Sequence, residues 1–223
     1  MRLVCREYGL DIVFEENKAV DIVVESAESY LSFLSRIWNQ INGGEEFIVL
    51  SEDDKVLELG KVSDFITDPF HIDINNKKII SRIYQEMSNY ANSMEIERIR
   101  QIQMILDMFV SDSCDKFETP LSYEYAFNVT DIYKLYNVHI DIDETDPLSR
   151  MISYVKLRHK VLGTGLFIFS NLKSYFSEDD LRLFYETMNY EKINIMLLER
   201  YENKRSEYEK RIIIDEDSCI IMD

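Results

Sequence analysis

Two short apolar runs in the last third of the chain constrain its fold more than any other feature. Residues 166–170 (LFIFS) and 193–198 (INIMLL) each have the length and composition of one buried strand, and residues 178–188 between them are predicted to form a helix. Ser177 is a suitable N-cap for that helix, although a capping box would prefer Glu where Asp180 stands. This order predicts two strands of a mainly parallel sheet, with the helix on one of its faces.

Further strands and helices are predicted around this unit. The first 25 residues contain three β-rich runs that suggest a strand meander. Residues 27–41 are predicted to form a helix that stops at Asn42-Gly43-Gly44, and a strand pair with a turn at Asp53-Asp54 follows it. A strand at 138–142, a helix at 148–162 and a last strand near 219–222 complete the prediction.

A long helical tract is predicted from about residue 76 to residue 117. One of its faces is apolar and carries Ile96, Ile99, Ile102, Leu106 and Phe109. Because this tract lies between β-rich flanks, we predict that it forms an inserted helical leg. The predicted domains are an α/β head of residues 1–75 and 138–223 and a leg of residues 76–137.

Composition argues against several classes of protein. Cys5, Cys114 and Cys219 are odd in number and follow no metal-binding spacing, so neither a disulfide framework nor a zinc site is predicted. No apolar run approaches the roughly 18 residues of a membrane span, and the N-terminus carries acids where a signal peptide needs apolar residues. We therefore expect a soluble, cytoplasmic protein. The net charge of -17 disfavours nucleic-acid binding unless basic residues gather on one surface.

Catalytic motifs are missing from the sequence. No GxxxxGK[ST] loop that could hold nucleotide phosphates and no GxSxG motif is present. Asn171 and Glu199 are interpreted as polar residues that close two strands. The histidines His71, His139 and His159 are far apart and form no metal-binding motif. We predict no catalytic residue.

The segment 147–177 has a charge opposite to that of the rest of the chain. It contains no Asp or Glu, in a protein with 42 of them, and it carries Arg150, Lys156, Arg158, Lys160 and Lys173. The predicted helix at 148–162 could present four of these side chains to phosphate groups. A solvated helix surface paired with acidic neighbours is an equally simple interpretation. A weaker basic group consists of Lys77, Lys78, Arg82, Arg98 and Arg100, which could serve only for pairing along helices.

Clustered acids raise the question of a hard cation such as Ca²⁺, which prefers six to eight oxygen ligands. One group begins on one side of the predicted strand at 138–142 and continues after it, and the other flanks the turn after the long helical tract. Neither matches the spacing of an EF-hand, so solvated acids are the simpler interpretation. The two groups are His139, Asp141, Asp143, Glu144 and Asp146, and Asp112, Asp115, Glu118 and Glu124.

The order of these features resembles one known family. An N-terminal meander, the segment VSDFITDPFHIDINNKKIISRIYQEM, the helical excursion, the basic residues before LFIFSN, then YFSEDDL, NIMLLER and the tail IIIDED are similar to the Csn-two family of type II-A CRISPR systems. The similarity covers nearly the whole chain and is sharpest over residues 160–200. It implies an α/β head related to ATPase cores but without a P-loop or bound nucleotide, together with an inserted α-helical leg.

The resemblance also implies a function. Members of the family form homotetrameric rings whose basic inner surface encircles double-stranded DNA from its ends without cleaving it. They act as accessory factors in spacer acquisition, the adaptation step of antiviral defence, beside the CRISPR integrase subunits and the effector nuclease. The resemblance implies phosphate contacts by Lys156, Arg158 and Lys160, then Arg150, Arg98 and Arg100, and calcium ligands among Asp115, Glu118 and Glu124. A divergent nucleotide-dependent enzyme and a protein-only scaffold are the alternatives.

Overall fold

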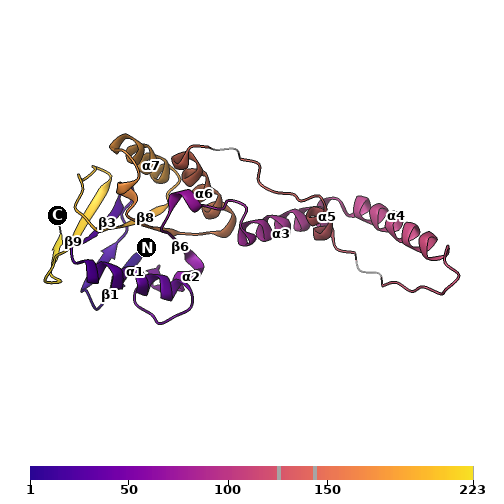
Figure 1. Ribbon diagram of the computed structural model, residues 1–223, viewed down its shortest axis with the longest axis horizontal. Helices are drawn as coiled ribbons and strands as arrows, with labels where there is room; N and C mark the ends of the chain where they lie inside the picture. Colours follow the sequence, from indigo (N-terminus) through magenta and orange to yellow (C-terminus); the bar gives the residue numbers. More distant parts are fainter. Residues whose placement is uncertain (125–126, 143–144, 223) are drawn as a thin grey trace. The chain divides into compact units, whose positions relative to one another are not determined.

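The computed structural model describes residues 1–124, 127–142 and 145–222, and it divides into two compact units (Figure 1). The first unit consists of Met1–Asp73 and Asp143–Asp223, and the second consists of Ile74–Ile142. Asp143 and Glu144, which belong to the acidic group after the predicted strand at 138–142, lie outside the described residues. Within the described ranges, no helix is long and apolar enough to cross a membrane.

The larger sheet of the first unit has six strands among the described residues, in the order β10-β9-β3-β8-β7-β6. Strands β9, β3, β8, β7 and β6 run parallel, and β10 pairs antiparallel with β9 at one edge. The two runs that dominate the sequence are β7 and β8, which lie side by side, so their predicted parallel pairing is confirmed. The strand bounds are β3 (Ala19–Val24), β6 (Ser63–Ile66), β7 (Leu166–Ser170), β8 (Asn194–Glu199), β9 (Glu209–Ile214) and β10 (Ile220–Met222).

The smaller sheet is antiparallel, with the order β2-β1-β4-β5. Its strands are β1 (Arg2–Cys5), β2 (Leu10–Val13), β4 (Val49–Glu52) and β5 (Lys55–Leu57). The predicted turn at Asp53-Asp54 is confirmed: both residues have positive φ, 49° and 62°, which a two-residue hairpin turn of type I′ requires. The predicted meander is partly wrong, because the third run, β3, leaves this sheet and joins the larger one. All six residues of β3 are buried, as expected for a central strand covered on both faces.

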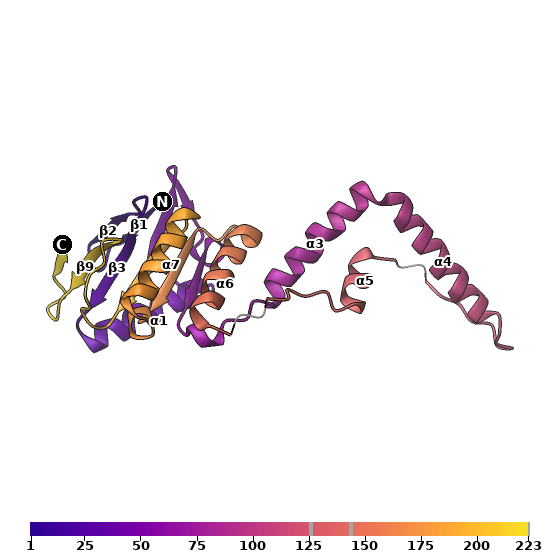
Figure 2. The ribbon, with the colours of Figure 1, turned by 90° about the horizontal axis from the view of Figure 1, so that it is seen from above.

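Helices cover both faces of the larger sheet. On one face, Ile22 and Ile168 belong to a core with Phe33 of α1 (Ala27–Ile41) and with the smaller sheet. On the other face, Phe169 contacts Phe184 of α7 (Glu178–Tyr190), with ring centroids 5.4 Å apart. Figure 1 shows α6 (Pro147–Leu162) and α7 above the sheet and α1 below it, and Figure 2 shows α6 and α7 side by side. Shorter helical turns are α2 (Leu59–Val62), η1 (Pro69–His71) and η2 (Leu172–Ser174).

Local capping explains where α6 and α7 begin. The Ser177 hydroxyl accepts a hydrogen bond from the Asp180 backbone N–H at 3.3 Å, and the Asp180 carboxylate accepts one from the Ser177 backbone at 3.1 Å. Asp180 therefore completes a capping box, although Glu is the usual residue there. Asp146 caps α6, and Gly163 ends it in the left-handed conformation with φ of 69°. These signals place the predicted helices at 148–162 and 178–188 within one or two residues of the observed bounds.

The second unit contains α3 (Lys77–Met94), α4 (Ile96–Cys114) and α5 (Val129–Leu135) among its described residues. The predicted long tract is therefore two helices that meet at Glu95. Helix α3 packs against α5 through Ser88 and Thr130, whose hydroxyls are 2.9 Å apart. The Tyr84 hydroxyl donates a hydrogen bond to the Val138 carbonyl at 2.7 Å, which ties the chain after α5 back to α3.

The predicted strand at 138–142 is wrong. Residues 138–142 have no regular structure, and the side chain of Asn75 bonds to both backbone groups of Ile140, with the Asn75 amide donating at 3.1 Å and its oxygen accepting at 2.8 Å. The alternation of apolar and polar residues in VHIDI predicts a half-buried strand. Val138 and Ile140 are half-buried and His139 is exposed, so the burial alternates as it would in a strand although no strand forms. The Asn75 amide here replaces the partner strand that this segment lacks.

Candidate nucleic-acid interface

The buried face of α6 determines which of its basic side chains reach solvent. Leu148, Met151 and Val155 are buried, so the opposite side of the helix is open. Lys156 and Lys160 lie one turn apart on that open side, and both are exposed. The Lys156 ammonium is 2.7 Å from a Glu191 carboxylate oxygen, with 44% of its side chain exposed. Lys160 has no carboxylate partner among the residues that the structure describes.

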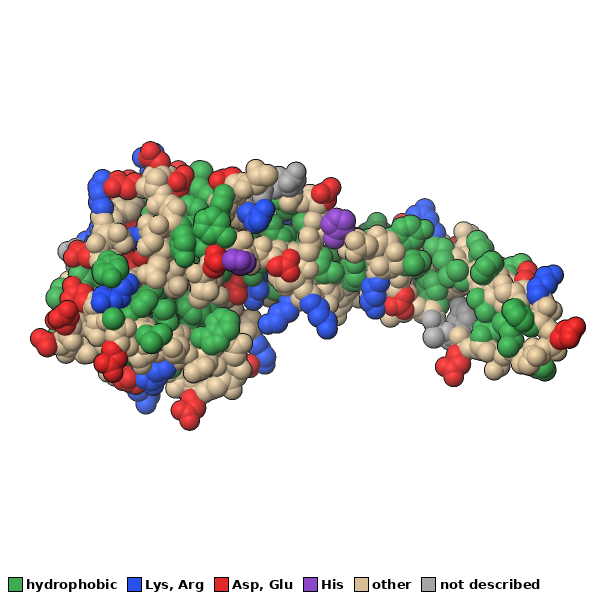
Figure 3. Space-filling view, in the orientation of Figure 1, with side chains coloured by type: hydrophobic (Ala, Val, Ile, Leu, Met, Phe, Trp, Pro, Cys, Tyr) green, Lys and Arg blue, Asp and Glu red, His purple; other side chains and the backbone are tan. Residues whose placement is uncertain are grey.

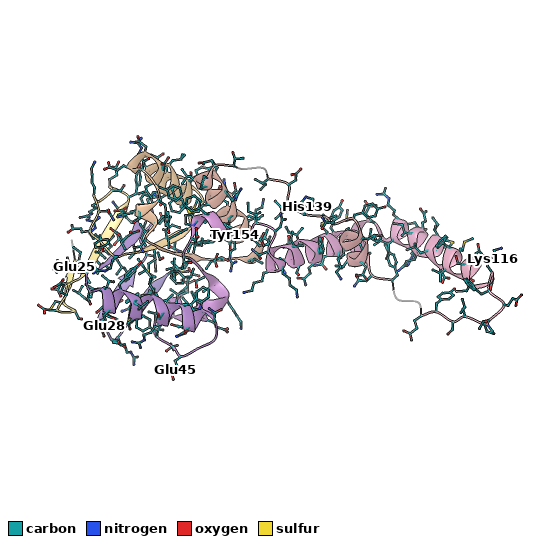
Figure 4. All side chains as sticks on the ribbon, viewed as in Figure 1. Glu25, Glu28, Glu45, Lys116, His139 and Tyr154 are labelled. Carbon is teal, nitrogen blue, oxygen red and sulfur yellow. The ribbon has the colours of Figure 1, made fainter. Side chains whose placement is uncertain are left out.

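Arg158 faces inward, although it lies between these two lysines in the sequence. Its side chain is only 12% exposed, and its Nε is 3.3 Å from a carboxylate oxygen of Asp64. It also donates to the Tyr154 hydroxyl at 2.9 Å, and that hydroxyl donates to Asp64 at 2.8 Å (Tyr154 is labelled in Figure 4). Burial, and then the Asp64 charge, raise the pKa of Tyr154. Arg158 thus joins α6 to β6, which leaves Lys156 and Lys160 the more accessible cations.

The remaining predicted phosphate contacts have other surroundings. Arg150 is half-buried on α6 and already engaged in an interaction within the protein. Arg98 and Arg100 lie on α4 in the second unit, where their side chains are 74% and 65% exposed. They pair with Glu95 at 3.1 Å and Glu97 at 3.6 Å, and such exposed pairs contribute little to stability. Four of the six predicted residues therefore lie on α6, but only Lys156 and Lys160 among these four are exposed.

Lys173, the fifth basic residue of the acid-free segment 147–177, is buried. It belongs to a buried charge cluster that consists of Asp21, Lys173, Glu199, Glu209 and Arg211 on the α7 side of the larger sheet. The Lys173 ammonium lies 2.7 Å from Asp21 and 2.8 Å from Glu209, while the Arg211 guanidinium donates to Asp21 at 2.8 Å. Sequence reasoning missed this cluster, although its signal was Asp21 inside the apolar strand β3, together with charged residues at the end of β8 and the start of β9.

The buried charge cluster shifts the ionisation of its members. Burial, supported by the charges of Asp21 and Glu209, raises the pKa of Glu199 to about 7. The backbone N–H of Lys173 opposes this shift by donating to the Glu199 carboxylate at 3.1 Å. Burial also raises the pKa of Tyr185, whose hydroxyl donates to Glu209 at 2.7 Å. With three acids and two bases, the cluster carries a net negative charge whenever Glu199 is ionised.

A bound nucleotide would be expected at the carboxyl ends of the parallel strands, next to a helix N-terminus. Here β3 enters α1 through only Glu25 and Ser26, and Ser26 is the N-cap of α1. The side chains of Glu25 and of Glu28, in the first turn of α1, lie near this end of the first unit (Figure 4). A two-residue connection leaves no loop to surround phosphates, and both carboxylates would repel them.

Asn171 and Glu199, interpreted from sequence as strand-closing residues, have structural contacts. Asn171 adopts the left-handed conformation, with φ of 51°, and its backbone N–H donates to the Leu198 carbonyl at 2.9 Å. Its side-chain oxygen accepts from the Arg200 backbone at 3.2 Å, so it joins the ends of β7 and β8. Glu199 is 1% exposed. Both residues therefore make structural contacts at the carboxyl ends of β7 and β8.

The predicted calcium ligands Asp115, Glu118 and Glu124 are all exposed. Across the described ranges 1–124, 127–142 and 145–222, no three His, Cys, Asp or Glu side chains come together in a group that could hold a metal ion. The structure thus does not bring these three carboxylates to one point within a single chain.

A family model decides what kind of protein this is. The model for CRISPR-associated protein (Cas_Csn2) matches residues 40–218. The chain belongs to this CRISPR-associated family. The resemblance of the sequence to the Csn-two family is thereby confirmed, and the matched range of this Cas_Csn2 protein includes every predicted phosphate contact.

Two further comparisons add little to this assignment. No curated protein matches the chain. Among solved structures, a putative ABC transporter ATP-binding protein from Pyrococcus furiosus is similar, with 8% sequence identity and a TM-score of 0.40, covering 91% of this chain and 88% of that chain.

Proposed function

We propose that this Cas_Csn2 protein is a non-enzymatic subunit that binds double-stranded DNA at its ends as an accessory factor in spacer acquisition. Membership of the CRISPR-associated family carries the proposal. The structure supports it with Lys156 and Lys160, two exposed cations one turn apart on α6, in a segment without acids. Contacts of this kind neutralise phosphates and read no bases, so binding is independent of DNA sequence.

Helix α4 supports the second part of the proposal, a homotetrameric ring. None of its residues is buried, although apolar side chains occupy much of its second half. Green side chains gather over α4 in Figure 3, and Ile105 and Phe109 are 66% and 69% exposed. An apolar surface of this extent is unfavourable in water, and a second copy of the chain would cover it. In such a ring, basic inner surfaces and an acidic outside coexist despite the net charge of -17.

The geometry at the sheet edge favours this function over a nucleotide-dependent enzyme. The short Glu25-Ser26 connection offers no phosphate loop, and the ionisable Glu199 lies inside the buried charge cluster. A protein-only scaffold is the other alternative, and it predicts that DNA is not bound. CRISPR integrase subunits and the effector nuclease are the proposed protein partners. Calcium binding through Asp115, Glu118 and Glu124 stays a prediction, tested by comparing the mass of the protein in Ca²⁺ and in EGTA.

Binding of a labelled linear duplex, measured by fluorescence anisotropy at several salt concentrations, tests the proposal. Lys156→Gln combined with Lys160→Gln is expected to make the salt slope shallower by about 1.8, which is 0.9 for each lost phosphate contact. The matched control is Lys61→Gln with Lys204→Gln, which removes two lysines that are 74% and 75% exposed.

Two results would contradict the proposal. The first is equal affinity for a covalently closed circle and for linear DNA of the same sequence, because a ring that loads from ends requires free ends. The second is an α6 variant that binds DNA as the control variant does. A separate measurement of mass in solution, with and without linear duplex, gives the number of protein copies in the assembly.

A further inference from the structure

Helix α3 lies in a second segment that is poor in acids. Residues 74–94 contain one acid, Glu86, together with Lys77, Lys78 and Arg82, in a chain with 42 acids and 25 basic residues. This segment has a net charge of about +2 where the average composition of the chain would make it negative. Sequence reasoning treated these cations as members of helical pairs, and that interpretation holds only for Arg82, whose Nε is 3.1 Å from Glu86.

The packing of α3 separates its two faces. Ile79, Tyr84 and Ala91 are buried on one face, which is held to α5 and the following chain by the Ser88–Thr130 and Tyr84–Val138 hydrogen bonds. The other face is open to solvent. Its residues are cations and small or amide side chains, interrupted by one acid: Lys77, Lys78, Ser81, Arg82, Gln85, Glu86, Asn89, Asn92 and Ser93.

This open face, called here the α3 polar face, has the composition of a surface that contacts a nucleic-acid backbone. Arg and Lys neutralise phosphates, and Ser, Asn and Gln donate hydrogen bonds to phosphate and sugar oxygens. The 18 residues of α3 span about 27 Å, long enough to follow several phosphates of a duplex. Figure 3 shows Lys and Arg side chains along the lower edge of α3, with tan polar surface between them.

The first turn of α3 shows that these cations do not serve helix stability. Asn76 is the N-cap and accepts from the Ile79 backbone at 3.2 Å, but the first turn contains no acid and begins with Lys77 and Lys78. Cations at a helix N-terminus oppose the helix dipole. Neither lysine has a carboxylate partner in the part of the chain that the structure describes. An anion that approaches this turn would relieve the repulsion.

We propose that the α3 polar face is a DNA-backbone contact surface of the second unit, additional to the α6 lysines. The inference rests on the proposed function and specifies where in the second unit the duplex is held. Lys77, Lys78 and Arg82 supply the ionic contacts. The Arg82–Glu86 pair is exposed on both sides, 47% and 53%, so a phosphate can replace Glu86 at little cost.

The test is the salt dependence of linear duplex binding by the full-length protein. Lys77→Gln, Lys78→Gln and Arg82→Gln together are expected to make the slope shallower by about 2.7, for three contacts at 0.9 each. The control variant carries Lys61→Gln, Lys134→Gln and Lys204→Gln, which removes three exposed cations and the same total charge. Thermal unfolding of both variants checks that they fold. Because Lys77 and Lys78 oppose the helix dipole, the thermal midpoint of the triple α3 variant is expected to equal or exceed that of the wild type.

A second variant adds charge without removing a cation. Asn89→Asp places one carboxylate in the middle of the α3 polar face, and Asn39→Asp places one at an exposed position of α1 as its control. Asn89→Asp is expected to weaken duplex binding about fivefold, the Boltzmann factor for two like charges in contact in water. The control is expected to bind like the wild type.

The outcomes separate this inference from the proposed function. If the wild type binds duplex and both α3 variants match their controls, the α3 polar face makes no contact and the inference is overturned, while the proposed function stands. If the wild type binds no duplex at all, the proposed function and this inference fail together. If only the α3 variants lose binding, and Lys156→Gln with Lys160→Gln does not, the inference holds and the α6 contact is wrong.

Discussion

Replacing Glu199 by Gln is expected to stabilise the protein above neutral pH. The Glu199 carboxyl group is 1% exposed and shares the buried charge cluster with two other acids, which is why its pKa rises from 4.5 to about 7. Gln has nearly the same shape and keeps an oxygen to accept the hydrogen bond from the Lys173 backbone. It cannot ionise, so it mimics the protonated form of Glu199 at every pH.

The size and sign of this effect follow from linkage between protonation and folding. The folded protein holds the Glu199 proton up to about pH 7, whereas the unfolded chain releases it near pH 4.5. The stability that this group contributes is therefore fully present below about pH 4.5 and is lost as the pH rises through 7. At 1.36 kcal/mol per pKa unit, the loss amounts to about 3 kcal/mol. Glu199→Gln should recover about this amount at pH 8 and almost none at pH 4.5.

Urea unfolding followed by circular dichroism at pH 5, 6, 7 and 8 measures this difference. Glu178→Gln is the control, because Glu178 is 68% exposed and pairs with Lys204 on the surface. An exposed pair contributes about 0–1 kcal/mol, with little dependence on pH over this range. The reasoning is refuted if Glu199→Gln is less stable than the wild type at pH 8, or if the difference between the two proteins is the same at pH 5 and pH 8.

Three further predictions concern particular contacts. Lys173→Met removes the ammonium between Asp21 and Glu209, and the uncompensated buried charge should cost about 3–5 kcal/mol of unfolding free energy in urea; a loss below that of an exposed lysine variant would count against the buried pairing. Ser177→Ala removes the α7 capping box and should cost about 1 kcal/mol, whereas Ser177→Asp, which can still cap, should restore most of it. Phe109→Ser on the exposed side of α4 should lower the mass in solution, measured by light scattering, without lowering the thermal midpoint. An unchanged mass would show that α4 does not hold copies together.

The elements of the first unit that could be predicted from sequence are those with both a strong pattern and a clear boundary. Strands β7 and β8 each have an apolar centre, Leu166–Phe169 and Ile195–Leu198, because helices and the smaller sheet cover both of their faces. Helix α1 was predicted at its observed bounds, since Ser26 caps it and Asn42-Gly43-Gly44 stops it. The segment 138–142 failed because alternation of apolar and polar residues predicts a half-buried strand without indicating whether a partner strand exists.

The candidate site was predictable only as a set of residues, without their exposure. Lys156, Arg158 and Lys160 look equivalent in sequence, yet Arg158 meets Asp64, which lies 94 positions earlier in the chain. Lys173 was counted among the basic residues of the acid-free segment, and its partners Asp21 and Glu209 also come from distant strands. Long-range pairing of this kind depends on strand order, which the local pattern of residues does not determine.

The same pairing changes the electrostatic argument for DNA binding. Of the five basic residues in segment 147–177, Arg158 and Lys173 are neutralised inside the first unit, so the excess positive charge that can reach a phosphate on α6 is smaller than the sequence implies. If the chain, with a net charge of -17, binds DNA as proposed, further attraction has to come from other cations. The α3 polar face is where the described structure offers further exposed cations with a single acid among them. If the α6 and α3 variants each reduce the salt slope in proportion to the cations removed, both surfaces contact one duplex. If neither variant alone changes the slope but the combined variant does, the two surfaces replace one another at the same phosphates.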